Sequence, residues 1–202
     1  MGIFIKRAFD FTLTLVGLVL SSPLWIIFSL AIYLEDRGPV LFFQERHGRT
    51  GRRFQIIKFR TMRYTGEDRN LVIFLENDPR VTRVGKLLRA TAMDELPTLI
   101  NILKGDMSFV GPRALPFKIE DEERVRYENI TQVPGYQVRS QVKPGLTGIA
   151  QVYAPKDIDR RKKFRYDNLY VRRMSFCFDL KLILLSFWIT FKGKWEHRGR
   201  KI

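Results

Sequence analysis

A long stretch without charge near the amino terminus constrains this chain more than any other feature. No charged residue occurs between Phe11 and Leu34, and most of the side chains there are apolar. At about 1.5 Å per residue, a helix over this stretch would be about 36 Å long, enough to reach across a hydrocarbon core of about 30 Å. We therefore expect a membrane helix. A cleaved signal peptide fits poorly, because the stretch is too long and no small-residue cleavage site follows it.

Proline at the centre of the stretch predicts a helix that is not straight. Ser22-Pro23 lies midway, and proline removes a helical hydrogen bond and clashes with the preceding turn. We expect a break or sharp kink there, with serine hydroxyls bonding the carbonyl groups that proline leaves free. A buried core helix is the alternative, but a chain of 202 residues offers little protein to wrap around it.

Charge on both sides of the stretch bears on its topology. Lys6 and Arg7 precede it, and the chain as a whole carries a formal net charge of +15. Positive flanks prefer the cytoplasmic side, so a helix that enters and leaves by one face suits both flanks. We predict a re-entrant membrane helix within residues 1–36 and a second domain over residues 37–202. An ordinary kinked transmembrane span is the alternative.

The rest of the chain predicts a small, mostly helical α+β domain. Short strands are expected at 40–44 and 54–60, where a turn-rich segment joins them into a hairpin. The last helix, over 180–191, is apolar with basic and aromatic neighbours, so it is expected either at a membrane interface or in the core. Spacing and charge predict helices at 84–90, 96–103, 115–137, 160–173 and 180–191.

Composition narrows the function classes. The positive charge, together with 45% hydrophobic residues, indicates a folded protein with an anionic partner: nucleic acid, a phospholipid surface or a phosphorylated substrate. The single cysteine, Cys177, excludes a disulfide scaffold. With only His47 and His197 beside it, no zinc-binding pattern is present.

Two adjacent carboxylates are the leading candidates for chemistry. Asp94 and Glu95 lie just before an expected helix, and capping of that helix is the plainer interpretation of the pair. Carboxylates among several bases also suit a site where one oxygen attacks phosphorus and another holds Mg²⁺. The bases that bracket the pair in the sequence are Lys58, Arg60, Arg89 and Arg113.

Several segments resemble the motifs of the bacterial sugar transferase family, the monotopic phosphoglycosyl transferases that act on polyprenyl phosphate. Residues 93–97 (MDELP) and 101–113 (NILKGDMSFVGPR) resemble its central signature. Residues 58–62 (KFRTM) resemble the upstream motif, and residues 143–152 (KPGLTGIAQV) the downstream one. Ser22-Pro23 falls where the family breaks its re-entrant helix. The resemblance runs in order along nearly the whole chain, whose length matches the family's minimal catalytic unit.

The resemblance implies a two-step reaction. A UDP-sugar gives its sugar phosphate to an aspartate and UMP leaves; polyprenyl phosphate then attacks the phospho-aspartyl intermediate, giving a polyprenyl diphosphate sugar. Asp94 resembles the nucleophile and Glu95 the Mg²⁺ ligand. The candidates for binding phosphate are Arg89 and Arg113, followed by Lys58 and Arg60.

The same resemblance implies a place and partners for the enzyme. It is expected at the bacterial inner membrane, with its catalytic domain on the cytoplasmic face, at the first membrane step of surface-glycan assembly. An anionic phospholipid surface is a further expected partner, nucleic acid is not expected, and a homo-oligomer is compatible with the sequence. Ala114 departs from the family, which commonly has proline there.

Two rival functions belong to other classes. A membrane-tethered nucleic-acid binder would use the basic helix over 160–173. Only the positive charge supports this function, since no nucleic-acid-binding motif is present. A non-catalytic scaffold of glycan assembly would be expected to have lost the acidic pair, which is intact. The sugar stays open, because its selection is expected to depend on residues 64–80 and 115–141.

Overall fold

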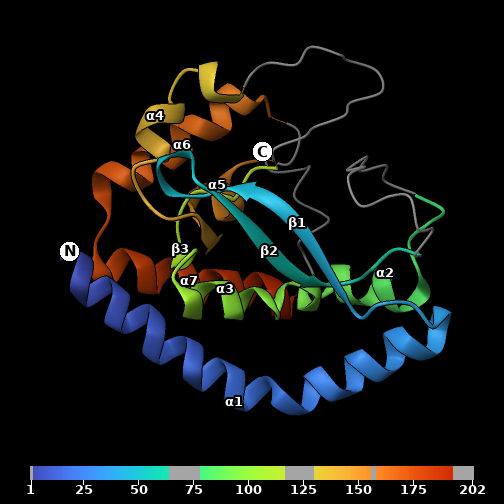
Figure 1. Cartoon of the computed structure of the whole chain (residues 1–202). Coiled ribbons are helices and arrows are strands. Elements are labelled where there is room, and N and C mark those ends of the chain that lie inside the picture. Colours follow the sequence, from blue (N-terminus) through green and yellow to red (C-terminus); the bar gives the residue numbers. More distant parts are fainter. Residues whose placement is uncertain (1, 64–77, 117–129, 156–157, 193–202) are drawn as a thin grey trace.

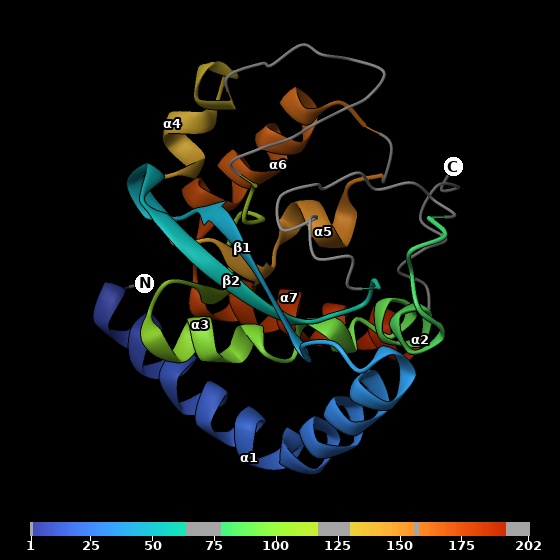
Figure 2. The ribbon, with the colours of Figure 1, turned by 45° about the vertical axis from the view of Figure 1, so that its right-hand side comes forward.

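The computed structural model describes residues 2–63, 78–116, 130–155 and 158–192, and it confirms an α+β fold that is mostly helical (Figure 1). Helix α1 (Ile3–Asp36) bows around one side of the molecule. Helices α3 (Thr98–Lys104) and α7 (Phe176–Phe191) lie on the inner side of that bow in both ribbon views (Figures 1 and 2).

The expected hairpin and most of the expected helices are present in the described residues. Helix α7 begins a turn earlier than predicted, because the Ser175 hydroxyl caps it by accepting the N–H of Phe178 at 3.3 Å. Most of the helical stretch expected at 115–137 lies outside the described residues. The other elements are β1 (Leu41–His47), β2 (Arg53–Phe59), α2 (Arg83–Ala90), β3 (Ser108–Val110), α4 (Tyr136–Arg139), β4 (Gly145–Thr147), α5 (Ile149–Tyr153) and α6 (Arg160–Arg173).

Helix α1 continues through Pro23 instead of ending there, and it bends in its middle (Figure 1). Proline has no N–H to give to the carbonyl of Val19, four residues earlier. The Ser22 hydroxyl donates to that carbonyl at 2.8 Å, as the sequence predicts for the serines beside the proline. The helix therefore tolerates proline as a bend.

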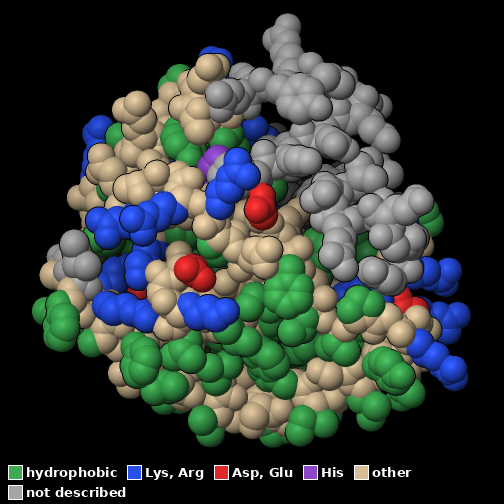
Figure 3. All heavy atoms as spheres, viewed as in Figure 1, with side chains coloured by type: hydrophobic (Ala, Val, Ile, Leu, Met, Phe, Trp, Pro, Cys, Tyr) green, Lys and Arg blue, Asp and Glu red, His purple; other side chains and the backbone are tan. Residues whose placement is uncertain are grey.

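The apolar surface of α1 faces away from the rest of the protein. The segment Phe4–Asp36 is long and apolar enough to cross a membrane, and only 11% of its most apolar window is buried. The exposed side chains include Val19, Leu20 and Ile26. Hydrophobic side chains cover the lower face in Figure 3, the side along which α1 runs in Figure 1. The low burial excludes a buried core helix for this segment.

Charged side chains tie the first turns of α1 to the body. The Lys6 ammonium donates to the buried carboxylate of Asp179 on α7 at 2.5 Å. The Arg7 guanidinium donates to the last carbonyls of α3, those of Ile102 at 2.6 Å and Leu103 at 2.7 Å. A cation at a helix C-terminus satisfies carbonyls that have no partner within the helix.

The other end of α1 is tied to the same body. The Glu35 carboxylate accepts the N–H groups of Arg83 at 2.7 Å and Val84 at 3.0 Å, in the first turn of α2. Asp36 forms an ion pair with Arg60, the residue after β2. A separation into residues 1–36 and 37–202 stays a prediction, since α1 packs on the body at both ends.

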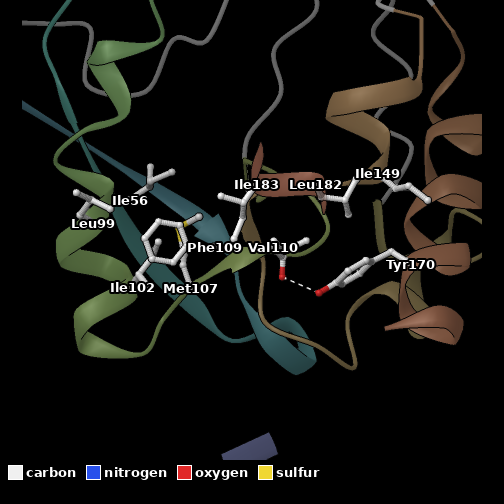
Figure 4. Packing of buried hydrophobic residues seen from close by; sticks show 10 residues of the cluster. All are labelled: Ile56, Leu99, Ile102, Met107, Phe109, Val110, Ile149, Tyr170, Leu182 and Ile183. Carbon is white, nitrogen blue, oxygen red and sulfur yellow. Dashed lines mark hydrogen bonds between the residues drawn. The ribbon is translucent and has the colours of Figure 1, made fainter. Parts of the chain in front are cut away.

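The main core lies between β2, α3, β3, α5, α6 and α7 (Figure 4). The Tyr170 hydroxyl donates to the carbonyl of Val110 at 3.0 Å and contacts Asp179 at 2.9 Å, so its buried oxygen is satisfied. The core residues are Ile56, Leu99, Ile102, Met107, Phe109, Val110, Ile149, Tyr170, Leu182 and Ile183.

A short parallel pair of strands, β3 and β4, was not predicted. Ser108 pairs with Gly145 and Val110 with Thr147. The backbones approach so closely that a Cβ on Gly145 would lie 2.0 Å from the nitrogen of Gly111. Glycine is therefore required sterically, where the sequence indicates only a turn.

Substitution Gly145→Ala should destabilise the protein. The added methyl would meet backbone atoms, which cannot move aside as a side chain can, so we expect a loss of about 2 kcal/mol or more. Thermal unfolding of the detergent-solubilised protein measures this. Gly17→Ala is the matched control, because its Cβ would lie 3.5 Å from Leu99, an ordinary contact. Equal melting temperatures for the two variants would contradict the prediction.

Candidate active site

The two adjacent carboxylates lie on a strained turn between α2 and α3. After α2 ends, Ala92 adopts the left-handed conformation at φ 56°, ψ 19°, which costs a non-glycine residue about 1 kcal/mol or more. The chain reverses there and enters a 3-10 turn over Met93–Glu95. This turn places Asp94 and Glu95 beside β2.

Buried polar contacts fix α3, which follows the turn, against β2. The Thr98 hydroxyl donates to the carbonyl of Ile57 at 2.9 Å. The Asn101 amide accepts the N–H of Ile57 at 2.9 Å and donates to the carbonyl of Gln55 at 2.7 Å. Because Ile57 immediately precedes Lys58, these bonds fix the backbone of β2 beside Lys58 relative to α3 and the acidic turn.

Lys58 is the cation closest to both carboxylates. Its ammonium lies 2.5 Å from Glu95 Oε1 and 3.8 Å from Asp94 Oδ2. The side chains of Asp94 and Glu95 are 16% and 22% exposed, so both carboxyl groups are mostly buried but still accessible to a ligand. The structure thus brings together three residues that are far apart in the sequence.

Arg113 approaches the same group from the loop after β3. Its guanidinium lies 3.8 Å from Glu95 Oε1, and its side chain is 58% exposed. Its carbonyl accepts a hydrogen bond from Arg139 at 2.6 Å. Arg139 is itself held in a buried ion pair with Asp167 at 2.9 Å. The loop is therefore fixed while the Arg113 side chain stays free to meet a ligand.

The remaining candidates from the sequence divide into two groups. Arg89 donates to the Thr61 hydroxyl at 2.8 Å, and its charge lowers the pKa of Asp94, so it belongs electrostatically to the site. Arg60 is buried in its ion pair with Asp36 and has no contact with the acidic pair among the described residues. Ser22 and Pro23 lie midway along α1, where Pro23 interrupts the backbone hydrogen bonding and the Ser22 hydroxyl donates to the carbonyl of Val19.

The two carboxyl groups titrate differently. Burial raises the pKa of Asp94 to about 6; the charge of Lys58 opposes this shift, and that of Glu95 adds to it. Burial would also raise the pKa of Glu95, but Lys58 and Arg113 outweigh it and hold that pKa below its ordinary value. Two carboxylates whose pKa values are driven apart are suited to separate roles.

The donor set fits a magnesium ion shared with a ligand. No group of three or more His, Cys, Asp or Glu residues gathers anywhere in the described part of the chain. Mg²⁺ is commonly held by one or two carboxylates, completed by water and substrate phosphates, and the pair of Asp94 and Glu95 supplies that number. Glu95, ionised across the neutral range, is the better ligand of the two.

Arg46 of β1 is a further charged residue at this site, and it is not among the candidates that the sequence indicates. It lines one hollow together with Lys58, Glu95 and Arg113. It is only 9% exposed, and its guanidinium donates to the carbonyl of Ala114 at 3.1 Å. In the sequence it stands among the bases of an ordinary hairpin turn, so no local pattern distinguishes it.

Comparison with known proteins finds relatives that are named as sugar-phosphate transferases or as polysaccharide-production proteins. The UDP-glucose:undecaprenyl-phosphate glucose-1-phosphate transferase of Escherichia coli (strain K12) is 40% identical over 94% of this chain and 40% of its own length. An N-acetylgalactosamine counterpart from Aeromonas hydrophila, UDP-N-acetylgalactosamine-undecaprenyl-phosphate N-acetylgalactosaminephosphotransferase, is 39% identical over 89% of this chain and 42% of its own length. The exopolysaccharide production protein PSS of Rhizobium leguminosarum bv. phaseoli is 38% identical over 91% of this chain and 93% of its own length.

These relatives differ in architecture and in the sugar that they are named for. The chain spans about two fifths of the Escherichia coli and Aeromonas relatives and nearly all of the Rhizobium one. Glucose and N-acetylgalactosamine transferases match it about equally well, so similarity does not select a sugar. The profile of the bacterial sugar transferases matches residues 1–193, and the chain belongs to that family.

Proposed function

We propose that this protein transfers a sugar 1-phosphate from a UDP-sugar to polyprenyl (undecaprenyl) phosphate through a covalent intermediate on Asp94. The observation that carries the proposal is the mostly buried acidic turn, where two carboxyl groups with different pKa values lie close to Lys58 and Arg113. Phosphoryl transfer depends chiefly on in-line positioning and charge neutralisation, which this arrangement supplies.

In the first step, an Asp94 oxygen attacks the phosphorus next to the sugar. The new bond joins that oxygen to phosphorus, the bond to the bridging oxygen breaks, and UMP leaves with the electron pair. In the second step, a polyprenyl phosphate oxygen attacks the same phosphorus. The bond to Asp94 breaks, its carboxylate is restored, and the product is a polyprenyl diphosphate sugar.

The neighbouring side chains divide the remaining work. Glu95 would hold Mg²⁺, which when bound neutralises charge on the diphosphate. Lys58 keeps Glu95 ionised and limits the rise in the pKa of Asp94. The exposed guanidinium of Arg113 is available to phosphate oxygens, to which it can donate two parallel hydrogen bonds.

The proposed membrane arrangement is a re-entrant α1 with the catalytic body on the cytoplasmic face. Support comes from the attachment of both ends of α1 to the same body, through Lys6 and Arg7 at one end and Glu35 and Asp36 at the other. Much of the apolar surface in the middle of α1, including Val19, Leu20 and Ile26, is exposed. A soluble nucleotide sugar and a lipid phosphate would meet at this interface, where basic residues also attract anionic headgroups.

Substitution Asp94→Asn should abolish the first step. Without the attacking carboxylate, we expect UMP release from a UDP-sugar to fall by on the order of 10³-fold or more, and no phospho-sugar adduct in intact-mass spectrometry. Asp159→Asn, the same change at an exposed acid, is the control and should keep the activity. Full turnover of the Asp94→Asn variant would exclude the covalent mechanism.

The pH dependence of the first step should reflect the raised pKa of Asp94. The neutral acid predominates below a pKa of about 6, so single-turnover UMP release should fall as pH drops through that value. Lys58→Met removes the charge that opposes the shift, and the acid limb should therefore move to higher pH. An acid limb that stays in place in this variant would contradict the assigned electrostatics.

Cysteine labelling should find both ends of α1 on one side of the membrane. In a Cys177→Ser background, Phe4→Cys and Arg37→Cys should react with an impermeant maleimide only after the cells are permeabilised. The exposed Cys177 of the unaltered chain reports the side on which the body lies. Labelling of one position alone in intact cells would show a transmembrane span instead.

A further inference from the structure

The buried guanidinium of Arg46 has no carboxylate partner among the described residues. One of its amino groups donates to the carbonyl of Ala114, and the other to the side-chain oxygen of Gln44. Its Nε is buried and has no hydrogen-bond partner in the described part of the chain. A buried charge that lacks both a counter-ion and one of its hydrogen bonds is costly, so this residue calls for an explanation.

The nearest charges do not neutralise Arg46. Glu95 lines the same hollow, but its carboxylate is engaged by Lys58 at 2.5 Å and approached by Arg113 at 3.8 Å. Burial and then the like charge of Arg113 lower the pKa of Arg46 to about 10, and the charge of Glu95 opposes this shift only in part. The hollow is therefore lined by three cations and one carboxylate, and one of these cations, Lys58, also lies 3.8 Å from Asp94.

We infer that Arg46 binds a phosphate group of a substrate from within this hollow, with Nε as a donor. The inference deepens the proposed function and rests on it for the identity of the substrates. An arriving phosphate would supply both things that Arg46 lacks, a counter-ion and an acceptor for Nε. The phosphate could belong to the diphosphate of the nucleotide sugar or to the polyprenyl phosphate, and the same guanidinium chemistry serves either.

A purely structural role is the competing explanation. Arg46 joins β1 to the loop that carries Arg113, through the carbonyl of Ala114, and it could serve only to hold that loop. The two roles make opposite predictions for Gln44, whose side chain accepts from Arg46. A carboxylate at position 44 would strengthen the contact with Arg46 but neutralise the charge offered to a phosphate.

The test is therefore Gln44→Glu, an isosteric change that provides Arg46 with an internal counter-ion. Calorimetric titration with Mg²⁺ and inorganic pyrophosphate should show an affinity lower by about 10- to 100-fold, as expected for the loss of a charge-assisted contact. The melting temperature should stay the same or rise. Arg53→Gln, at an exposed base of β2, removes one charge elsewhere and should leave binding unchanged.

A second ligand and a second variant complete the experiment. Farnesyl phosphate stands for the lipid acceptor: weakened pyrophosphate binding assigns Arg46 to the nucleotide sugar, and weakened farnesyl phosphate binding assigns it to the acceptor. Arg46→Lys keeps the charge but removes the guanidinium Nε, and it should lower the affinity for the same ligand as Gln44→Glu does.

Normal affinity for both ligands in Gln44→Glu and Arg46→Lys, or no phosphate binding by the unaltered protein, would overturn the inference. Release of UMP from UDP-sugars by the unaltered protein is measured separately. That assay decides the proposed function, whereas the binding assays decide the role of Arg46.

Discussion

The fixing of both ends of α1 to a single body is the constraint on which the rest of the structure depends. At one end the ammonium of Lys6 meets the buried carboxylate of Asp179, and at the other Asp36 meets Arg60. These charges lie at the ends of the helix, while much of the apolar surface of its middle is exposed. The helix can bend between its fixed ends because Ser22 donates to the carbonyl that Pro23 leaves free.

In the candidate active site, charged side chains lie close together around the acidic turn. Burial of the acidic turn raises the pKa of Asp94, and nearby cations keep Glu95 ionised. Arg113 is held through its backbone by the buried pair of Arg139 and Asp167, so its side chain is exposed but its position is set. Under the proposed function, such preorganisation has positive charge already in place to neutralise phosphate, without rearrangement during the reaction.

Sequence and structure agree best where local chemistry decides the outcome. The hairpin, the basic helix α6 and the serine contact beside Pro23 depend on neighbouring residues, and the sequence predicts each of them. The parallel pairing of β3 with β4 was missed, because it joins segments far apart in the chain. The sequence suggests Arg60 and Lys58 equally as phosphate ligands, yet Arg60 is paired with Asp36, and of the two it is Lys58 that contacts the acidic pair.

By itself, the sequence determined that an uncharged stretch must leave water, that a proline lies at its centre, and that an acidic pair occurs in a basic chain. Composition and local spacing suffice for these conclusions, since hydrophobic transfer and helix geometry act within a segment. Only the tertiary structure decided which cations reach the carboxylates, and that Arg46 lies buried without a carboxylate partner among the described residues. Electrostatic interactions depend on distance and burial in space, and neither can be read from positions along a chain.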